Sequence, residues 1–141
     1  MNSYFKRRLH SILAAALLSL GVLSSANIPL DAMKMSAIAI YGAETTQMID
    51  QWIAMIIKIR GLSDKEKLTY TNNFFNSRIK WISDIQNWQE EDYWATPLET
   101  MARRKGDCED FSISKYITLL LAGMPDEKLR ITYVKARVDT A

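Results

Sequence analysis

The residues best suited to chemistry stand together at positions 107–110, where the chain's only cysteine, Cys108, is flanked by three acidic residues, Asp107, Glu109 and Asp110. A cysteine acts as a nucleophile through its thiolate. Neighbouring carboxylates oppose the formation of another anion beside them. This conflict eases if a histidinium pairs with the sulfur, or if a hard cation such as Ca²⁺ binds some of the carboxylate oxygens. The motif therefore favours a reactive thiol that has such a partner.

The position of Cys108 on a predicted helix supports a reactive thiol. Asp107 is a good N-cap residue, and Asp110 stands three positions later, where a capping-box side chain reaches back to the N-cap backbone. We expect a helix that starts at Cys108 and ends before Gly123 and Pro125. The unpaired N–H groups and the positive dipole end of such a helix stabilise a thiolate.

The same helix is apolar around most of its circumference, which is typical of an element in the middle of a domain. Its apolar residues are Phe111, Ile113, Tyr116, Ile117, Leu119, Leu120 and Leu121. On such a helix a lone cysteine can instead be a small buried hydrophobe, and its acidic first turn can be ordinary capping. The residue types alone leave both interpretations of Cys108 open.

Two motifs around this helix resemble those of the bacterial transglutaminase-like cysteine peptidases, the LapG-type family. They are W-A-T-P-L-E at residues 94–99 and G-D-C-E-D-F at residues 106–111, and the resemblance extends from about Thr71 to Val138. It implies an α+β, papain-like or transglutaminase-like fold, with N-terminal helices and a central helix that bears the cysteine. It also implies calcium-dependent proteolysis of large cell-surface adhesins in the periplasm.

The resemblance further implies roles for particular residues. Cys108 matches the nucleophile of the family's Cys-His-Asp triad. Asp107 and Glu109 match calcium ligands that flank the family's cysteine, and Asp110 is a possible third ligand. Trp94 belongs to the motif beside the active helix, so we expect it to bind substrate as part of the cleft wall.

The segment around Trp94 has a second interpretation. Trp81 and Trp88 precede it, and an acidic run occupies residues 89–92. A loop held in place by large aromatic side chains, with a solvated acidic turn, would have the same composition.

The triad is incomplete in this sequence as given. The family's histidine and second aspartate lie beyond the strand that follows the cysteine helix, and the only histidine present is His10. Residues 129–138 alternate in the manner of that strand, which needs neighbouring strands to be stable. We therefore expect a partial domain at 27–141, with the sheet largely missing after residue 138 and without the catalytic histidine and aspartate.

The first 26 residues are typical of a secretory signal peptide. A basic stretch, Lys6 to Arg8, precedes an apolar run from Ile12 to Leu23, and small residues follow at 24–26. The apolar run is short of the ~20 residues that span a bilayer as a helix. We expect cleavage, a periplasmic location and no integral membrane span afterwards.

Removing that segment changes the charge balance. The whole chain has a net charge of +2, but residues 1–26 hold three basic residues and no acidic one, which leaves 15 basic and 16 acidic residues. The basicity is a targeting feature and gives no support for binding nucleic acid. In an oxidising compartment Cys108 has no internal disulfide partner, so we expect it to be buried or to be a free thiol.

Three further helices are predicted, at 47–60, from a Ser63–Glu66 capping box to about Arg78, and from Thr96 to about Arg104. The residues expected to be buried on the first two are Met48, Trp52, Met55, Ile56, Ile59, Leu68, Phe74 and Phe75. Residues 27–46 have little periodicity and form a poorly determined lead-in, with a weak strand pattern at 38–41.

Three functions are compatible with these observations. The first is an exported cysteine peptidase that uses Cys108. The second is a non-catalytic relic, or a protein that binds calcium or a partner through its acidic turn. The third keeps the cysteine chemistry but directs it to transamidation or amide hydrolysis on cell-wall peptide.

Overall fold

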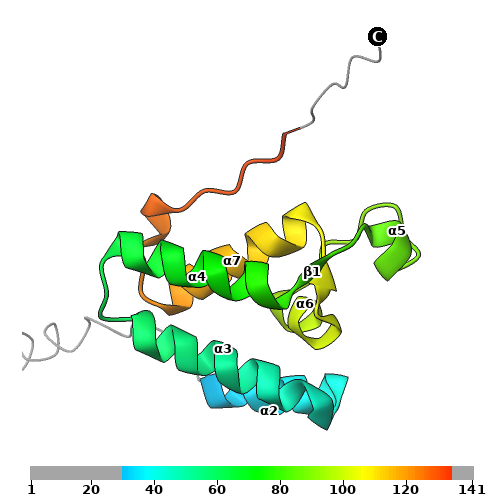
Figure 1. Cartoon of the computed structure of the whole chain (residues 1–141), viewed down its shortest axis with the longest axis horizontal. Helices are drawn as coiled ribbons and strands as arrows, with labels where there is room; N and C mark the ends of the chain where they lie inside the picture. The colour runs from blue at the N-terminus through cyan, green and yellow to red at the C-terminus, as the bar shows by residue number, and fades with distance from the viewer. Residues whose placement is uncertain (1–29, 135–141) are drawn as a thin grey trace, which may run out of the picture.

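The computed structural model describes residues 30–134, so the predicted signal peptide at 1–26 lies outside the described residues. In chain order the elements are α2 Leu30–Tyr41, η1 Ala43–Thr45, α3 Thr46–Ile59, α4 Asp64–Arg78, β1 Lys80–Trp81, α5 Asp84–Asn87, α6 Pro97–Arg103, β2 Lys105–Gly106, α7 Cys108–Leu121 and η2 Asp126–Lys128. Figure 1 shows α3 and α4 running side by side in opposite directions, with α2 on the far side of α3.

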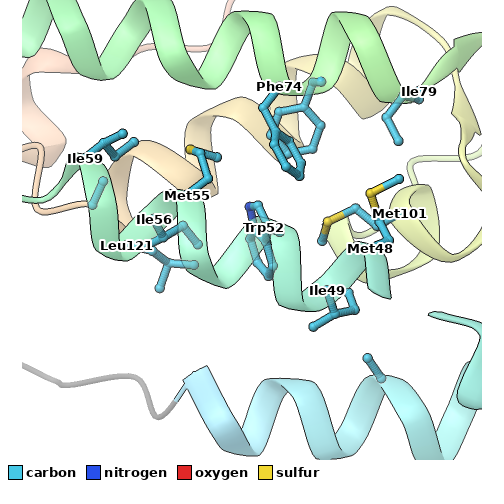
Figure 2. Packing of buried hydrophobic residues seen from close by; sticks show 13 residues of the cluster. Met48, Ile49, Trp52, Met55, Ile56, Ile59, Phe74, Ile79, Met101 and Leu121 are labelled. Atoms are coloured by element: carbon cyan, nitrogen blue, oxygen red, sulfur yellow. The ribbon is translucent and has the colours of Figure 1, made fainter. Parts of the chain in front are cut away.

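The apolar stripe of α3 is buried in the core, as predicted. Its buried residues are Met48, Ile49, Trp52, Met55, Ile56 and Ile59. Figure 2 shows Trp52 and Phe74 directed into the space between α3 and α4. The indole Nε1–H of Trp52 donates to the Thr118 hydroxyl at 2.8 Å, so the buried ring fixes α3 against α7 and leaves its polar atom satisfied.

The capping box predicted at Ser63–Glu66 is confirmed, and the helix predicted from Thr96 also begins with a capping box. In α4 the Ser63 N–H donates to Glu66 Oε2 at 3.0 Å, and in α6 the Thr96 N–H donates to Glu99 Oε2 at 2.8 Å. The prediction that Leu68 is buried is wrong, since it is 49% exposed. On α4 it is Thr71, Phe74 and Phe75 that face the core.

The lead-in is more regular than we expected. Residues 30–41 form helix α2 and not a weak strand. Met33, Ala37 and Tyr41 are four residues apart and thus share one face of the helix. Ala37 is fully buried, and Met33 and Tyr41 pack against the same core. Burial against α3 therefore stabilises a segment whose own sequence pattern is weak.

The segment that precedes Trp94, for which a loop was one of two interpretations, contains β1 and α5. The β1 strand pairs in parallel with β2: the Lys80 N–H donates to the Arg104 carbonyl at 2.9 Å, and the Ile82 N–H donates to the Gly106 carbonyl at 3.0 Å. By contrast, residues 129–134 of the predicted C-terminal strand pair with no other described segment, and 135–138 lie outside the described residues. Alternation alone does not make a strand without a neighbour.

Helix α7 packs against α4, α6 and α3. It ends before Gly123, as predicted, and the φ of 79° at Gly123 is the left-handed conformation that glycine adopts at little cost. The N–H groups of Gly123 and Met124 donate to the carbonyls of Leu120 and Leu119, both at 2.9 Å, which is a Schellman arrangement. Among the described residues, no helix is long and apolar enough to cross a membrane.

Candidate functional site

Cys108 is the first residue of α7, and its side chain is exposed. The short strand β2 leads directly into it, with Gly106 paired to β1 and Asp107 at the N-cap position. The interpretation of Cys108 as a small buried hydrophobe is therefore wrong. The thiol is accessible at a helix N-terminus that is held by a parallel strand pair.

Asp110 connects the two sequence motifs. Its side chain is fully buried, and its Oδ1 accepts from the Ala95 N–H at 2.8 Å. Its Oδ2 accepts from the Asp107 N–H at 3.4 Å, the capping contact predicted from the sequence. Asp110 thereby fixes the W-A-T-P segment beside the first turn of α7. This places Trp94 near Cys108.

Asp84, at the start of α5, was not predicted as a site residue. It is only 3% exposed; its Oδ2 accepts from the Tyr93 N–H at 2.7 Å, while its Oδ1 is buried without a hydrogen-bond partner among the described residues. Carboxylate oxygens of Asp84, Asp107 and Asp110 lie within 4.8 Å of one another. Oxygens of Asp84, Asp92 and Glu109 satisfy the same limit.

The predicted ligands Asp107, Glu109 and Asp110 therefore fall into two overlapping groups that share Asp84. No sequence pattern linked Asp84 to the cysteine turn, which is more than twenty residues further on. Asp92 belongs to the acidic run at residues 89–92, for which a solvated turn was one interpretation. The packing of α5 beside β2 brings Asp84 to the N-terminus of α7.

The crowding of carboxylates changes their protonation. Burial raises the pKa of Asp107 to about 7, with further contributions from the hydrogen bond and charge of Glu109 and from the charges of Asp84 and Asp110. Burial also raises the pKa of Asp110, against the opposing effect of the N–H groups of Ala95 and Asp107. The negative charges of the cluster are therefore not balanced by nearby positive groups among the described residues. A cation bound there would stabilise the ionised form of the carboxylates over the protonated form.

An aromatic stack holds the loop that carries Asp84 and Asp92. The ring of Trp88 stacks on Tyr93 with centroids 4.1 Å apart, and the guanidinium of Arg103 lies 3.7 Å from the Trp88 ring centroid. Arg103 also donates to the Asn87 carbonyl at 2.6 Å. Arg103 of α6 thus anchors the loop, in addition to the interaction with the helix dipole that its position at the C-terminus of α6 predicts.

Cys108 and Trp94 line the same hollow, of about 560 Å³. Trp94 is 54% exposed, and its Nε1–H donates to Asp92 Oδ1 at 2.9 Å, which orients the indole at the rim. Asp84, Asp107 and Glu109 also line this hollow, which we call the acidic hollow. The structure therefore brings the predicted nucleophile, the predicted substrate-binding tryptophan and the carboxylates together.

We predict that Gly106→Ala destabilises the protein by about 1–3 kcal/mol, the usual cost of overpacking. A Cβ at Gly106 would lie 2.7 Å from Asp110 Oδ2 and 2.8 Å from Asp110 Cβ, and the buried Asp110 cannot move away without losing its hydrogen bonds. The measurement is urea unfolding followed by circular dichroism. Gly61→Ala is the matched control, because a Cβ there meets nothing within 4 Å. Equal stabilities of the two variants would contradict the role given to Asp110.

Comparisons with known proteins agree with this geometry. The family model described as bacterial transglutaminase-like cysteine proteinase BTLCP matches residues 53–140. Two structures of LapG from Legionella pneumophila, one of them EGTA-treated, are each 31% identical with a TM-score of 0.60 and cover 71% of this chain. The match covers 53% of the EGTA-treated LapG chain and 54% of the other, so this chain spans about half their length. No curated protein matches.

The resemblance inferred from the two motifs is confirmed, as is the α+β, transglutaminase-like fold. The chain belongs to the bacterial transglutaminase-like cysteine proteinases.

Proposed function

We propose that the protein is a cysteine peptidase in which Cys108 is the nucleophile. The observation that carries this proposal is an exposed thiol at the N-terminus of α7 that lines a hollow together with Trp94, in a chain of a cysteine proteinase family. The Cys108 thiolate attacks the carbonyl carbon of a peptide bond, the C–N bond breaks, and the amine leaves with a proton. Water then hydrolyses the thioester and restores the thiol.

The proton acceptor for Cys108 is not a histidine of the described part of the chain, because residues 30–134 contain none. In the proposed mechanism this group is therefore supplied from outside those residues. The N-terminus of α7 contributes by stabilising the thiolate. Trp94 contributes an apolar wall for an extended peptide.

Calcium is the cofactor that we propose for the carboxylate cluster. Ca²⁺ takes six to eight oxygen ligands, and the buried Oδ1 atoms of Asp84 and Asp107 have no partner among the described residues. Asp84, Asp107 and Asp110 would hold the ion, or Asp84 with Asp92 and Glu109. A bound calcium ion would supply positive charge that offsets the carboxylates beside the Cys108 thiolate. EGTA, with which one of the two LapG samples was treated, is a calcium chelator.

We also propose export to the periplasm and a large cell-surface adhesin as substrate. Export is supported by the basic stretch at 6–8 and the apolar run at 12–23. The adhesin is supported by the family resemblance alone.

A second candidate function is calcium or partner binding without turnover. It is favoured by the buried Oδ1 atoms of Asp84 and Asp107, which have no partner among the described residues and could bind a cation without any contribution from the thiol.

We predict that Ca²⁺ stabilises the protein by about 2.7 kcal/mol at a hundredfold excess over its dissociation constant. Asp84→Asn should remove most of the resulting rise in Tm, because the amide keeps an acceptor for the Tyr93 N–H but removes the charge that faces the ion. Asp107→Ala should do the same. The measurement is calcium titration by thermal unfolding. Glu127→Gln, an exposed charge outside the cluster, is the control and should keep the full shift. A wild-type Tm that calcium leaves unchanged would rule out the metal site.

We predict that Cys108→Ala abolishes hydrolysis of an unfolded protein substrate, measured by release of new amino termini with calcium present. Because the side chain is exposed, the variant should keep the wild-type Tm, which separates loss of chemistry from loss of fold. Hydrolysis that survives the substitution would overturn the assignment of the nucleophile. Absence of turnover by both proteins would favour the binding function.

We predict that the full chain, produced in a bacterium, is recovered from the periplasmic fraction with its N-terminus near Asn27. Intact mass and N-terminal sequencing of the purified protein test this. A variant with Leu17→Arg and Leu18→Arg, which interrupts the apolar run, should stay in the cytoplasm and keep residues 1–26. Recovery of the unmodified chain from the cytoplasm with those residues retained would contradict export.

A further inference from the structure

We propose that a second hollow beside Cys108, distinct from the acidic hollow, binds an apolar side chain of the substrate next to the bond that is cleaved, and that Trp81 determines this preference. The proposal rests on the proposed peptidase function. The second hollow has a volume of about 370 Å³ and is lined by Asn76, Ile79, Trp81, Cys108, Phe111 and Lys115. We call it the apolar hollow.

The two hollows lie on different sides of the thiol. A helix with 3.6 residues per turn directs Phe111 and Lys115 to one side of Cys108, and Glu109 and Ser112 to the other. Phe111 and Lys115 line the apolar hollow, whereas Glu109 and Ser112 line the acidic hollow. Cys108 lines both. An extended peptide with its scissile carbonyl at the sulfur therefore places one neighbouring residue in each hollow, since consecutive residues advance by about 3.3 Å.

The chemistry of the apolar hollow selects its occupant. Trp81 is 61% exposed, although it is a large aromatic that gains most from burial, and it lines the hollow together with Phe111 of α7. No carboxylate among residues 30–134 lines this hollow, whereas Asp84, Asp92 and Glu109 are among those that line the other. The occupant is therefore an aromatic or aliphatic side chain.

Lys115 provides a charged group at one side of the apolar hollow. Its ammonium group donates to Asn72 Oδ1 and Asn76 Oδ1, both at 2.8 Å, and lies 5.3 Å from the Phe111 ring centroid. Burial lowers the pKa of Lys115. The two amide oxygens hold the ammonium group on the α4 side of the hollow, and Trp81, Ile79 and Phe111 provide the remaining contact surface for an apolar group.

The test uses the single cysteine of the full chain as a reporter and needs no peptidase turnover. Cys108 is alkylated with iodoacetamide or with N-benzyl iodoacetamide, and the rates are followed by intact mass. In both reactions a bond forms between Sγ and the reagent's CH₂ carbon, and iodide leaves as the C–I bond breaks. The two rates are divided by those of N-acetylcysteine, which corrects for the intrinsic reactivity of each reagent.

We predict that the wild-type protein prefers the benzyl reagent by roughly tenfold, because its phenyl ring is removed from water in the apolar hollow. Trp81→Ala should reduce this preference to near one. Trp94→Ala, the matched control in the acidic hollow, should keep the preference. Trp81→Gln replaces the alanine variant if circular dichroism shows that the latter is unfolded.

Three results would overturn the proposal: no preference in the wild-type protein, a preference that persists without Trp81, or a preference that is lost only in Trp94→Ala. None of these results depends on hydrolysis. A failure of the peptidase assay is therefore distinguishable from a failure of this subsite.

Discussion

The site depends on one buried carboxylate. Removing Asp110 from water is costly unless its oxygens are hydrogen-bonded, and the N–H groups of Ala95 and Asp107 provide those bonds. Gly106 lies so close that a side chain there would meet Asp110. Three segments thus have to pack around the Asp110 carboxylate: the end of the strand pair, the loop before α6 and the first turn of α7. Their fit sets the position of Cys108 relative to Trp94.

The negative charges of the carboxylates around Asp110 are only partly compensated. Asp84 is buried with one oxygen unpartnered, and Asp107 is crowded by Glu109 and its neighbours. The structure sustains this arrangement because the stack of Arg103, Trp88 and Tyr93 holds the loop in place by contacts that do not depend on the carboxylates' charge. A cation bound to carboxylates held in this way would therefore require little reorganisation of the loop.

The same helix N-terminus divides the surface around the thiol into two chemically different parts. The carboxylates gather on the side of Glu109, whereas the side of Phe111 carries Ile79 and Trp81 and is lined by no carboxylate among the described residues. This division follows from helical periodicity on α7 and from the β1 strand, which carries Trp81 to the Phe111 side. Orientation of a substrate across Cys108 would then be determined by its own sequence of polar and apolar residues.

The sequence by itself determined the features that depend on neighbours within about four residues: the capping box at Ser63, the helix that starts at Cys108 and its end at Gly123. Their hydrogen bonds are local, so residue types at fixed spacing predict them. Two others required tertiary structure. Ala37 lies in a helix because α3 buries it, and Asp84 joins the site because α5 packs beside β2. Such interactions join segments distant in the chain, and no local pattern encodes which segments will meet.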